Sequence, residues 1–321
     1  MPVRHSNLLA GASLRAREAV VRVANQPLVQ VRDGPGLVVD VTQGSLEVGR
    51  LIALAAMGGL ARLSLGFEDW GPHAVPAITV ETGTPLEACL GCQYAGWHVK
   101  VNKFSAMGSG PGRLKVAKEE VLARYRLSDP ERGAVFLLET RDPVDAPVLE
   151  YLAAQARVPL SDLAVIQAPT ASLVGSVQVA ARVVETALHQ WELRGGDLRA
   201  IRAAMGRCPI APVAPDDSTA IGWTNDAMLY AGRVWLWVDE DDAVIERLVK
   251  DTVAQASPAW GTPFTTLFQE AHGNFYEIDP GLFAPAVIQA VSLKSGRAFR
   301  AGVVHHRLLE ELWQWPSASP S

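Results

Sequence analysis

The stretch "SVQVAARVVET", from Ser176 to Thr186, places a guanidinium and a carboxylate three residues apart, at Arg182 and Glu185. On a helix this spacing puts both side chains on one face. A carboxylate that a neighbouring guanidinium keeps ionised and oriented can act as a general base toward a bound water. The same pair on a solvated helix face would add about 0.3 kcal/mol to stability. Spacing alone favours the surface pair, so the catalytic interpretation needs further signals.

A helix is predicted to position this pair. After the strand-like residues 163–169, a hydroxyl side chain at Thr170 or Ser172 can cap the helix, which should be continuous from Ser176 onward. At 100° per residue, Gln178 falls on the same polar stripe as the pair, opposite an apolar side. Small residues such as Ser176 would let a flat ligand approach, and they equally suit close helix packing.

A second candidate is the glycine-rich stretch "AMGSGPGR", which contains Gly108, Ser109 and Gly110. Such a loop can present backbone amides to an anion or a heterocycle. It fits neither the P-loop pattern nor the dinucleotide-binding pattern. An ordinary tight turn is the alternative interpretation.

Two further stretches carry polar or aromatic candidates. Asn225 and Asp226 belong to a proline-punctuated segment, 209–238, which reads as a loop ahead of a strand, and clustered Asp and Asn are more often turn and cap residues than ligands. Phe283, between glycine and proline turns, is either a core residue or a mobile aromatic wall.

Composition excludes several classes of protein. The 321 residues are 49% hydrophobic and 20% charged, with a net charge of -5, so nucleic acid is not an expected partner. The N-terminus has no apolar signal-peptide core, and the longest charge-free run, 163–181, is too polar to cross a bilayer. We therefore expect a cytoplasmic protein without membrane contact.

Metal and hydrolase signatures are missing. The three cysteines include a C-x-x-C pair at Cys89 and Cys92, but no further ligands follow at zinc-site spacing, which favours small buried residues. There is no H-E-x-x-H and no G-x-S-x-G motif. We expect neither a bound metal nor a serine nucleophile.

The distribution of elements predicts an α+β fold with mixed α/β layers. Helical periodicity is clear over 46–61. Short strand-like runs lie at 36–41, 77–80, 134–139, 163–168, 234–238 and 286–293. A turn-rich break at "RYRLSDPERG" predicts an N-terminal α/β part over 1–128 and a C-terminal α/β part over 129–321, and the two parts can be interleaved.

Taken together, these stretches resemble the methenyltetrahydromethanopterin cyclohydrolases. The resemblance rests on "MGGL", "QYAGW", "AMGSGP", "APTASLVGSVQVAARVVET", "PIAPV" with "AIGWTNDAMLYAG", and "FYEIDPGLFAPA", in this order and spacing, over nearly the whole chain. The family hydrolyses N5,N10-methenyltetrahydromethanopterin reversibly to the N5-formyl compound, without metal or other cofactor. The resemblance implies homotrimers of two-part subunits, with the pterin substrate in the cleft between the parts.

The resemblance also assigns residues. The family's catalytic Arg and Glu match Arg182 and Glu185, which makes the pair catalytic rather than a surface ion pair. The matching motifs give the expected substrate-binding residues Gly108, Ser109, Gly110, Ser176, Gln178, Asn225, Asp226 and Phe283.

Composition and family together suggest a cellular setting, and alternatives remain. The sequence lacks the Glu and Lys enrichment of hyperthermophiles, which favours a methylotrophic bacterium that oxidises formaldehyde. The alternatives are a non-catalytic protein that binds the pterin one-carbon carrier, a folate-type methenyl cyclohydrolase, and a generic α/β protein with an exposed ion pair.

Overall fold

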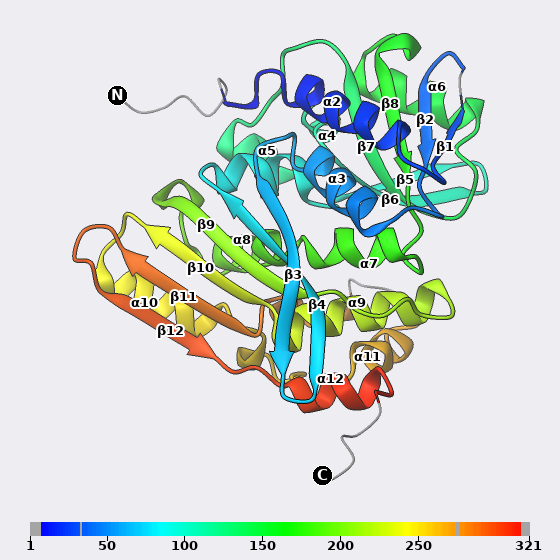
Figure 1. The fold of residues 1–321 in the computed structure, drawn as a ribbon. Coiled ribbons are helices and arrows are strands. Elements are labelled where there is room, and N and C mark those ends of the chain that lie inside the picture. The colour runs from blue at the N-terminus through cyan, green and yellow to red at the C-terminus, as the bar shows by residue number, and fades with distance from the viewer. Residues whose placement is uncertain (1–7, 33, 274–276, 316–321) are drawn as a thin grey trace. The chain divides into compact units, whose positions relative to one another are not determined.

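The computed structural model describes residues 8–32, 34–273 and 277–315 (Figure 1). The chain divides into two compact units, the first formed by residues 1–62 and 84–178 and the second by 63–83 and 179–321. Each unit has a six-stranded mixed sheet, and the predicted α+β class is confirmed.

The first unit is built on a sheet with the order β1-β2-β8-β7-β6-β5. Its central strands β2, β8 and β7 are parallel, and the outer pairs are antiparallel. The elements in chain order are α2 (Ala12–Ala24), β1 (Gln30–Arg32), β2 (Leu37–Asp40), α3 (Leu46–Ala56), η1 (Leu86–Gln93), β5 (Trp97–Val101), β6 (Phe104–Ser109), α4 (Arg113–Val116), α5 (Glu120–Tyr125), β7 (Ala134–Glu139), α6 (Ala146–Ala156), η2 (Leu160–Asp162), β8 (Leu163–Gln167) and α7 (Leu173–Ala180).

Alternation along the central strands builds a core on each face of this sheet. Leu137 and Ile166 pack with the buried sides of α2 and α3, while their neighbours Phe136 and Val165 pack with α6. Successive side chains of a strand point to opposite faces, so strands that are apolar throughout need cover on both. The sheet is accordingly the middle layer of three.

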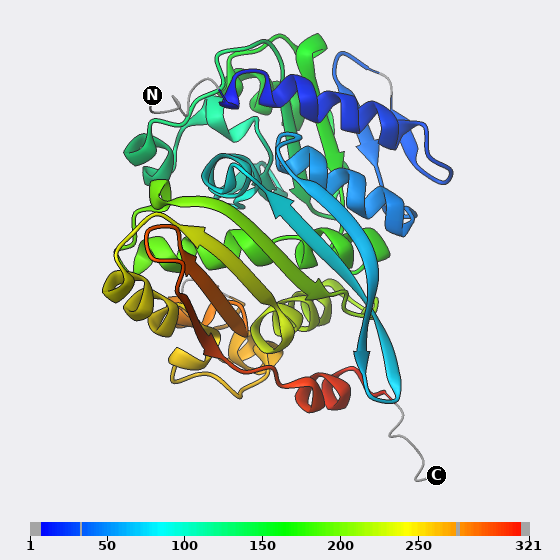
Figure 2. The same cartoon turned by 60° about the vertical axis from the view of Figure 1, so that its left-hand side comes forward.

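The second unit has the sheet order β12-β11-β10-β9-β4-β3, in which β10 and β11 are parallel. Its elements are β3 (Arg62–Trp70), β4 (His73–Thr82), α8 (Val183–Leu193), η3 (Leu198–Ala200), β9 (Ile201–Pro209), α9 (Asp217–Ala231), β10 (Arg233–Val238), α10 (Asp242–Asp251), η4 (Ala254–Ala256), α11 (Phe264–Glu270), η6 (Pro280–Leu282), β11 (Val287–Ser292), β12 (Ala298–Gly302) and α12 (His306–Leu312). The long hairpin β3–β4 lies beside β9 at one side of this sheet (Figure 2).

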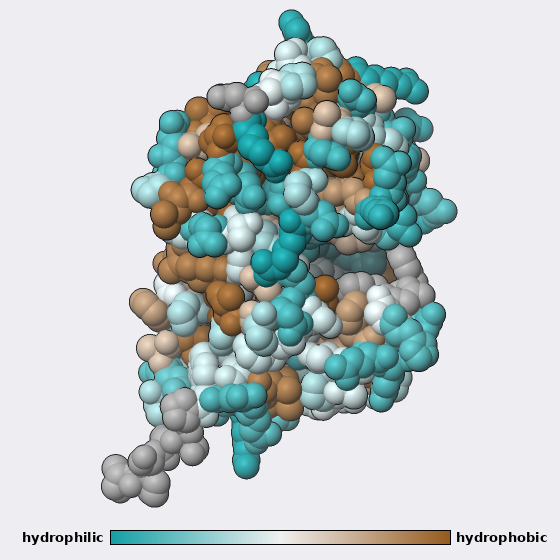
Figure 3. Space-filling model, turned by 90° about the vertical axis from the view of Figure 1, so that its right-hand side faces the viewer, coloured by the Kyte–Doolittle hydropathy of each residue, from teal (hydrophilic) through white to brown (hydrophobic). Residues whose placement is uncertain are grey.

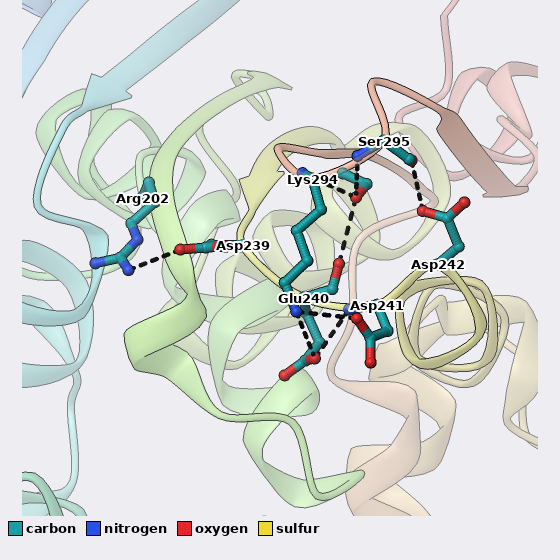
Figure 4. Close-up of polar contacts among 8 residues, drawn as sticks. Arg202, Asp239, Glu240, Asp241, Asp242, Lys294 and Ser295 are labelled. Carbon is teal, nitrogen blue, oxygen red and sulfur yellow. Dashed lines mark hydrogen bonds and ion pairs between the residues drawn. The ribbon is translucent and has the colours of Figure 1, made fainter.

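Surface ion pairs connect the β11–β12 hairpin with the start of α10, and β9 with the end of β10. Lys294, in the β11–β12 hairpin, lies 2.9 Å from the Asp241 carboxylate, and Ser295 donates to Asp242 at the start of α10 (Figure 4). Arg202 on β9 pairs with Asp239 after β10. Exposed pairs of this kind each contribute little to stability, so they fix the hairpin locally rather than hold the unit together.

The observed helices, strands and unit boundaries can be compared with those predicted from the sequence. The strand-like runs are strands, and the 46–61 helix is α3, which ends at Ala56. Residues 217–231 form the helix α9 instead of the predicted loop, because Asp216 caps its first turn and the prolines all precede it. The division by contacts does not fall at residue 128, since β7 pairs with β6 across that position.

The surface mixes residue types. The face drawn in Figure 3 carries both hydrophilic and hydrophobic residues. Within the described ranges, every helix is too short or too polar to span a membrane.

Candidate active site

The helix that carries Arg182 and Glu185 is interrupted between them. Ser172 caps α7 by accepting from the amide of Gly175 at 2.9 Å, as predicted. The predicted continuous helix is wrong, because α7 ends at Ala180 and α8 begins at Val183. The amide of Arg182 donates to the Val179 carbonyl, a tight turn that closes α7 and leaves Arg182 at the N-cap of α8.

This interruption places Glu185 in the first turn of α8. The N-terminus of a helix carries partial positive charge from amides that have no partner within the helix, and it stabilises a nearby carboxylate. Thr186 anchors the same turn, since its hydroxyl donates to the Arg182 carbonyl at 3.0 Å. The backbone and the guanidinium therefore both place positive charge near the Glu185 carboxylate.

The pair itself is buried. Arg182 Nη1 lies 3.6 Å from Glu185 Oε2, and the two side chains are 7% and 10% exposed. The surface ion pair that spacing alone favoured is therefore wrong. At this distance, and with an effective dielectric constant of about 20, the attraction is about 5 kcal/mol before desolvation is subtracted. Such a pair is expensive to break from one side, which suits a fixed catalytic group.

A glycine on the neighbouring strand lets the first turn of α8 approach the sheet. A Cβ added at Gly206 of β9 would lie 2.6 Å from Val184 and 2.7 Å from Val183. No ordinary side chain fits at that distance, so Gly206 sets the depth at which α8 packs. The position of Glu185 depends on this contact.

Helix α9 lies against α8 and carries two of the expected substrate-binding residues. Thr186 contacts Met228 through a 3.6 Å hydroxyl to sulfur hydrogen bond. Asn225 donates its amide to the Ile221 carbonyl of its own helix at 2.8 Å. Asp226 is completely buried, and its Oδ1 accepts from the backbone amide of Phe264 at 2.8 Å.

The electrostatics of Asp226 are unusual. Its Oδ2 is buried and has no hydrogen-bond partner among the residues that the structure describes. Burial raises the pKa of Asp226 from 3.8 to about 7, and the hydrogen bond from Phe264 opposes this only in part. A carboxyl group on α9 thus changes charge near neutral pH.

Phe283 follows the short helix η6 and is partly exposed. Gln190 of α8 donates to the Pro280 carbonyl at the start of η6. The Phe283 ring meets the Phe264 ring edge to face, with centroids 5.6 Å apart. Phe283 is thus a partly exposed ring packed on buried Phe264, and its role in substrate binding stays a prediction; the first two residues of the motif "FYEIDPGLFAPA" lie outside the described ranges.

In the first unit, the glycine-rich stretch is the end of β6 and the turn that follows. Gly108 and Ser109 pair with Leu138 and Leu137 of β7. The Gly110 amide donates to the Cys92 carbonyl at 2.9 Å, so this amide is already used inside the protein. Gly110 has a φ of +100°, which only glycine adopts easily.

Sequence reasoning missed the residue that holds this turn. Arg113 is completely buried, pairs with Glu119 at 2.8 Å, and donates to the carbonyls of Gly91 and Cys92. Its guanidinium also lies over the Tyr94 ring. The motifs "QYAGW" and "AMGSGP" thus meet around one arginine, and its place at the end of the glycine-rich stretch, directly after Gly112, was the available signal.

Ser176 and Gln178 lie on α7 and are 1% and 2% exposed. Within the described ranges, Gln178 Nε2 is buried without a hydrogen-bond partner. The expected site residues thus form two groups. Arg182, Glu185, Asn225, Asp226 and Phe283 belong to the second unit, and Gly108, Ser109, Gly110, Ser176 and Gln178 belong to the first.

The cysteines have structural roles. Cys89, Cys92 and Cys208 are buried and free, as the small-residue interpretation predicted. Burial raises the pKa of the Cys92 thiol to about 12, which makes it a poor nucleophile. The described residues contain no group of three or more potential metal ligands.

The amino-acid sequence is similar to a known protein family over most of its length. Residues 25–313 match the family model described as cyclohydrolase (MCH). Proteins named methenyltetrahydromethanopterin cyclohydrolase are similar along most of the chain. The protein from Xanthobacter autotrophicus is 39% identical and covers 89% of this chain and 86% of its own. The Methylobacterium nodulans protein is 40% identical, with coverage of 83% and 84%. The protein from the methanogen Methanococcoides burtonii is 36% identical, with coverage of 84% and 85%. The chain therefore belongs to the cyclohydrolase (MCH) family of enzymes.

Proposed function

We propose that this protein catalyses the reversible hydrolysis of N5,N10-methenyltetrahydromethanopterin to N5-formyltetrahydromethanopterin, with Glu185 as the proton-transfer group and Arg182 as its partner. The observation that carries the proposal is the buried pair at 3.6 Å, on a helix N-terminus, in a chain of this family.

The substrate needs little activation. Its methenyl carbon lies between two nitrogens in a cationic unit and is already electrophilic. A placed water adds to this carbon while Glu185 takes one of the water protons. Glu185 then gives that proton to N10, the bond between the carbon and N10 breaks, and the remaining hydroxyl proton leaves to solvent as the formyl carbonyl forms. One water is consumed, and the positive charge leaves as a proton.

Arg182 acts on Glu185 in this scheme. A guanidinium 3.6 Å away orients the carboxylate and keeps it ionised for the first proton transfer. Because both partners are nearly buried, each contributes to the compensation of the other's charge. Removing either one should therefore cost most of the activity that the pair provides.

Eight residues are proposed to bind or shape the substrate. Gln178 Nε2, which lacks a partner among the described residues, is a polar atom whose hydrogen-bonding capacity a ligand or a water could use, and Asp226, which has no exposed surface, would shape the site from behind. Phe283 would stack on a flat heterocycle. The remaining members of the set are Gly108, Ser109, Gly110, Ser176 and Asn225.

The proposal extends to the cellular setting. Relatives occur in methanogens as well as in methylotrophic bacteria. The composition, without Glu and Lys enrichment, favours formaldehyde oxidation in the cytoplasm of a methylotroph. We also propose a homotrimer, and a light-scattering mass of one subunit would contradict it.

The loss of the methenyl chromophore tests the function. Purified protein should bleach methenyltetrahydromethanopterin and leave methenyltetrahydrofolate intact under the same conditions. Bleaching of both would indicate a broader cyclohydrolase. Binding of the first compound without bleaching would support a non-catalytic carrier protein instead.

A further inference from the structure

One side of α9 carries three residues at four-residue steps, Gly222, Asp226 and Tyr230, and all of them contact the segment 261–265. Residues four apart on a helix lie above one another on the same face. The segment therefore lies along this face of α9, in contact with it at three levels.

Each level uses a different kind of contact. A Cβ added at Gly222 would lie 1.9 Å from the Thr265 hydroxyl and 3.0 Å from its Cβ, so a larger residue here would force Thr265 to move. Asp226 accepts from the Phe264 amide at 2.8 Å. At the third level the Tyr230 hydroxyl donates to the Thr262 carbonyl at 2.7 Å and accepts from the Gly261 amide at 3.1 Å.

These contacts determine where one aromatic ring lies. Phe264 is the first residue of α11 and is completely buried. Its amide is held by Asp226, and its ring meets Phe283 edge to face at 5.6 Å. Pro280, three residues before Phe283, is held independently of Phe264, because Gln190 of α8 donates to its carbonyl.

We propose that Asp226 and Tyr230 are positioning residues, which hold the segment 261–264 against α9 and so place Phe264 and Phe283 for substrate binding. The proposal rests on the proposed function, in which Phe283 contacts the pterin. It gives Asp226 an indirect role in binding, through Phe264, in keeping with a side chain that has no exposed surface.

We call the contacts of Asp226 and Tyr230 with the segment 261–264 the clamp. Three variants distinguish an effect of the clamp on substrate binding from a general loss of stability. Tyr230→Phe keeps the ring and removes both hydrogen bonds, and Asp226→Leu keeps the volume and removes the acceptor. Each should raise KM for the methenyl substrate by about tenfold, the usual effect of one or two buried hydrogen bonds, with kcat within about threefold of wild type. Asp226→Asn keeps an acceptor oxygen and should restore KM to within about twofold. Tyr151→Phe, in the first unit, is the matched control and should change neither parameter.

The route through Phe283 has its own test. In a Phe283→Ala background, Tyr230→Phe and Asp226→Leu should give little further increase in KM, because the ring they position is gone. A purely structural role predicts a smaller active fraction in both backgrounds and an unchanged KM. An unchanged KM in folded Tyr230→Phe, or an equal increase with and without Phe283, would overturn the proposal.

Hydrogen exchange gives a readout that does not depend on turnover. The amides of Gly261 and Phe264 should exchange faster in Tyr230→Phe and Asp226→Leu, respectively, while amides in α8 keep their protection. If wild-type protein fails to bleach the substrate, the proposed function fails, and the exchange result still decides whether the clamp exists. Wild-type exchange at both amides in the variants would refute the clamp even in an active enzyme.

Discussion

Replacing Asp226 by Asn should change how the stability of the protein depends on pH. Asp226 has a pKa near 7 in the folded protein and 3.8 as its ordinary value. Between these values the unfolded chain gives up a proton that the folded chain keeps. The contribution of Asp226 to the free energy of unfolding of the wild type is therefore fully present below pH 3.8 and is lost as the pH rises toward 7.

The size of the effect follows from the shift. A difference of about three pKa units corresponds to about 4 kcal/mol of stability lost between pH 4 and pH 8. Asn cannot ionise and stays in the neutral state at every pH. Its amide nitrogen, at the site of the unpartnered oxygen, adds a cost that does not vary with pH. The difference in unfolding free energy between Asp226→Asn and wild type should thus shift by about 2 to 3 kcal/mol, in favour of the variant, from pH 5 to pH 8.

Urea unfolding at pH 5, 6, 7 and 8 measures this difference. Asp217→Asn is the control, since it removes a carboxylate from the same helix at a partly exposed position. Its difference from wild type should change little over this range. If Asp226→Asn and wild type give parallel curves from pH 5 to pH 8, Asp226 does not titrate as a buried, uncompensated carboxyl group and the reasoning fails.

Other predictions concern the catalytic pair and its supports. Glu185→Gln should lower turnover by about 10²-fold or more with substrate still bound, and near-normal turnover would remove Glu185 from the mechanism. Arg182→Ala should also lower turnover, and the double variant should lose much less than the product of the two single effects, as measured by steady-state kinetics. Gly206→Ala should cost about 1–3 kcal/mol and lower kcat, whereas Gly83→Ala, with open space around its Cβ, should change neither stability nor rate. Gly110→Ala should reduce the yield of folded protein, because φ is +100° and the new Cβ would lie 2.7 Å from a backbone carbonyl; a normal melting curve would contradict this.

Local pattern was sufficient for the buried strands of the fold. The runs at 134–139 and 163–168 are apolar throughout and bounded by turn residues, and both are central strands covered on both faces. The sequence pattern did not predict the strands β3 and β9, because charged or glycine residues such as Glu68 and Gly206 interrupt their apolar alternation. Their positions depend on pairing with distant segments, which local pattern does not contain.

The site was predictable in its chemistry and not in its geometry. The resemblance named Arg182 and Glu185, but the turn between α7 and α8 contains no proline or glycine that would announce it. Prolines before residue 217 and clustered aspartates favoured a loop where α9 forms, although Asp216 is a normal N-cap. The four-residue spacing of Asp226 and Tyr230 was visible, but its partner segment lies more than 30 residues away.

The turn between α7 and α8 explains how a charged pair can be buried at this position. In a continuous helix, Arg182 and Glu185 would sit mid-helix, where every amide is already bonded and the backbone would not offset the desolvation of either charge. With the helix restarted at Val183, Glu185 occupies the first turn and gains the field of amides that have no partner within the helix, a contribution of up to about 2 kcal/mol in partly buried sites. Arg182, at the N-cap, gains no such contribution from the helix. The helix therefore stabilises the charge of Glu185 rather than that of Arg182, and so favours the ionised form of the carboxylate, which is the form that accepts a proton.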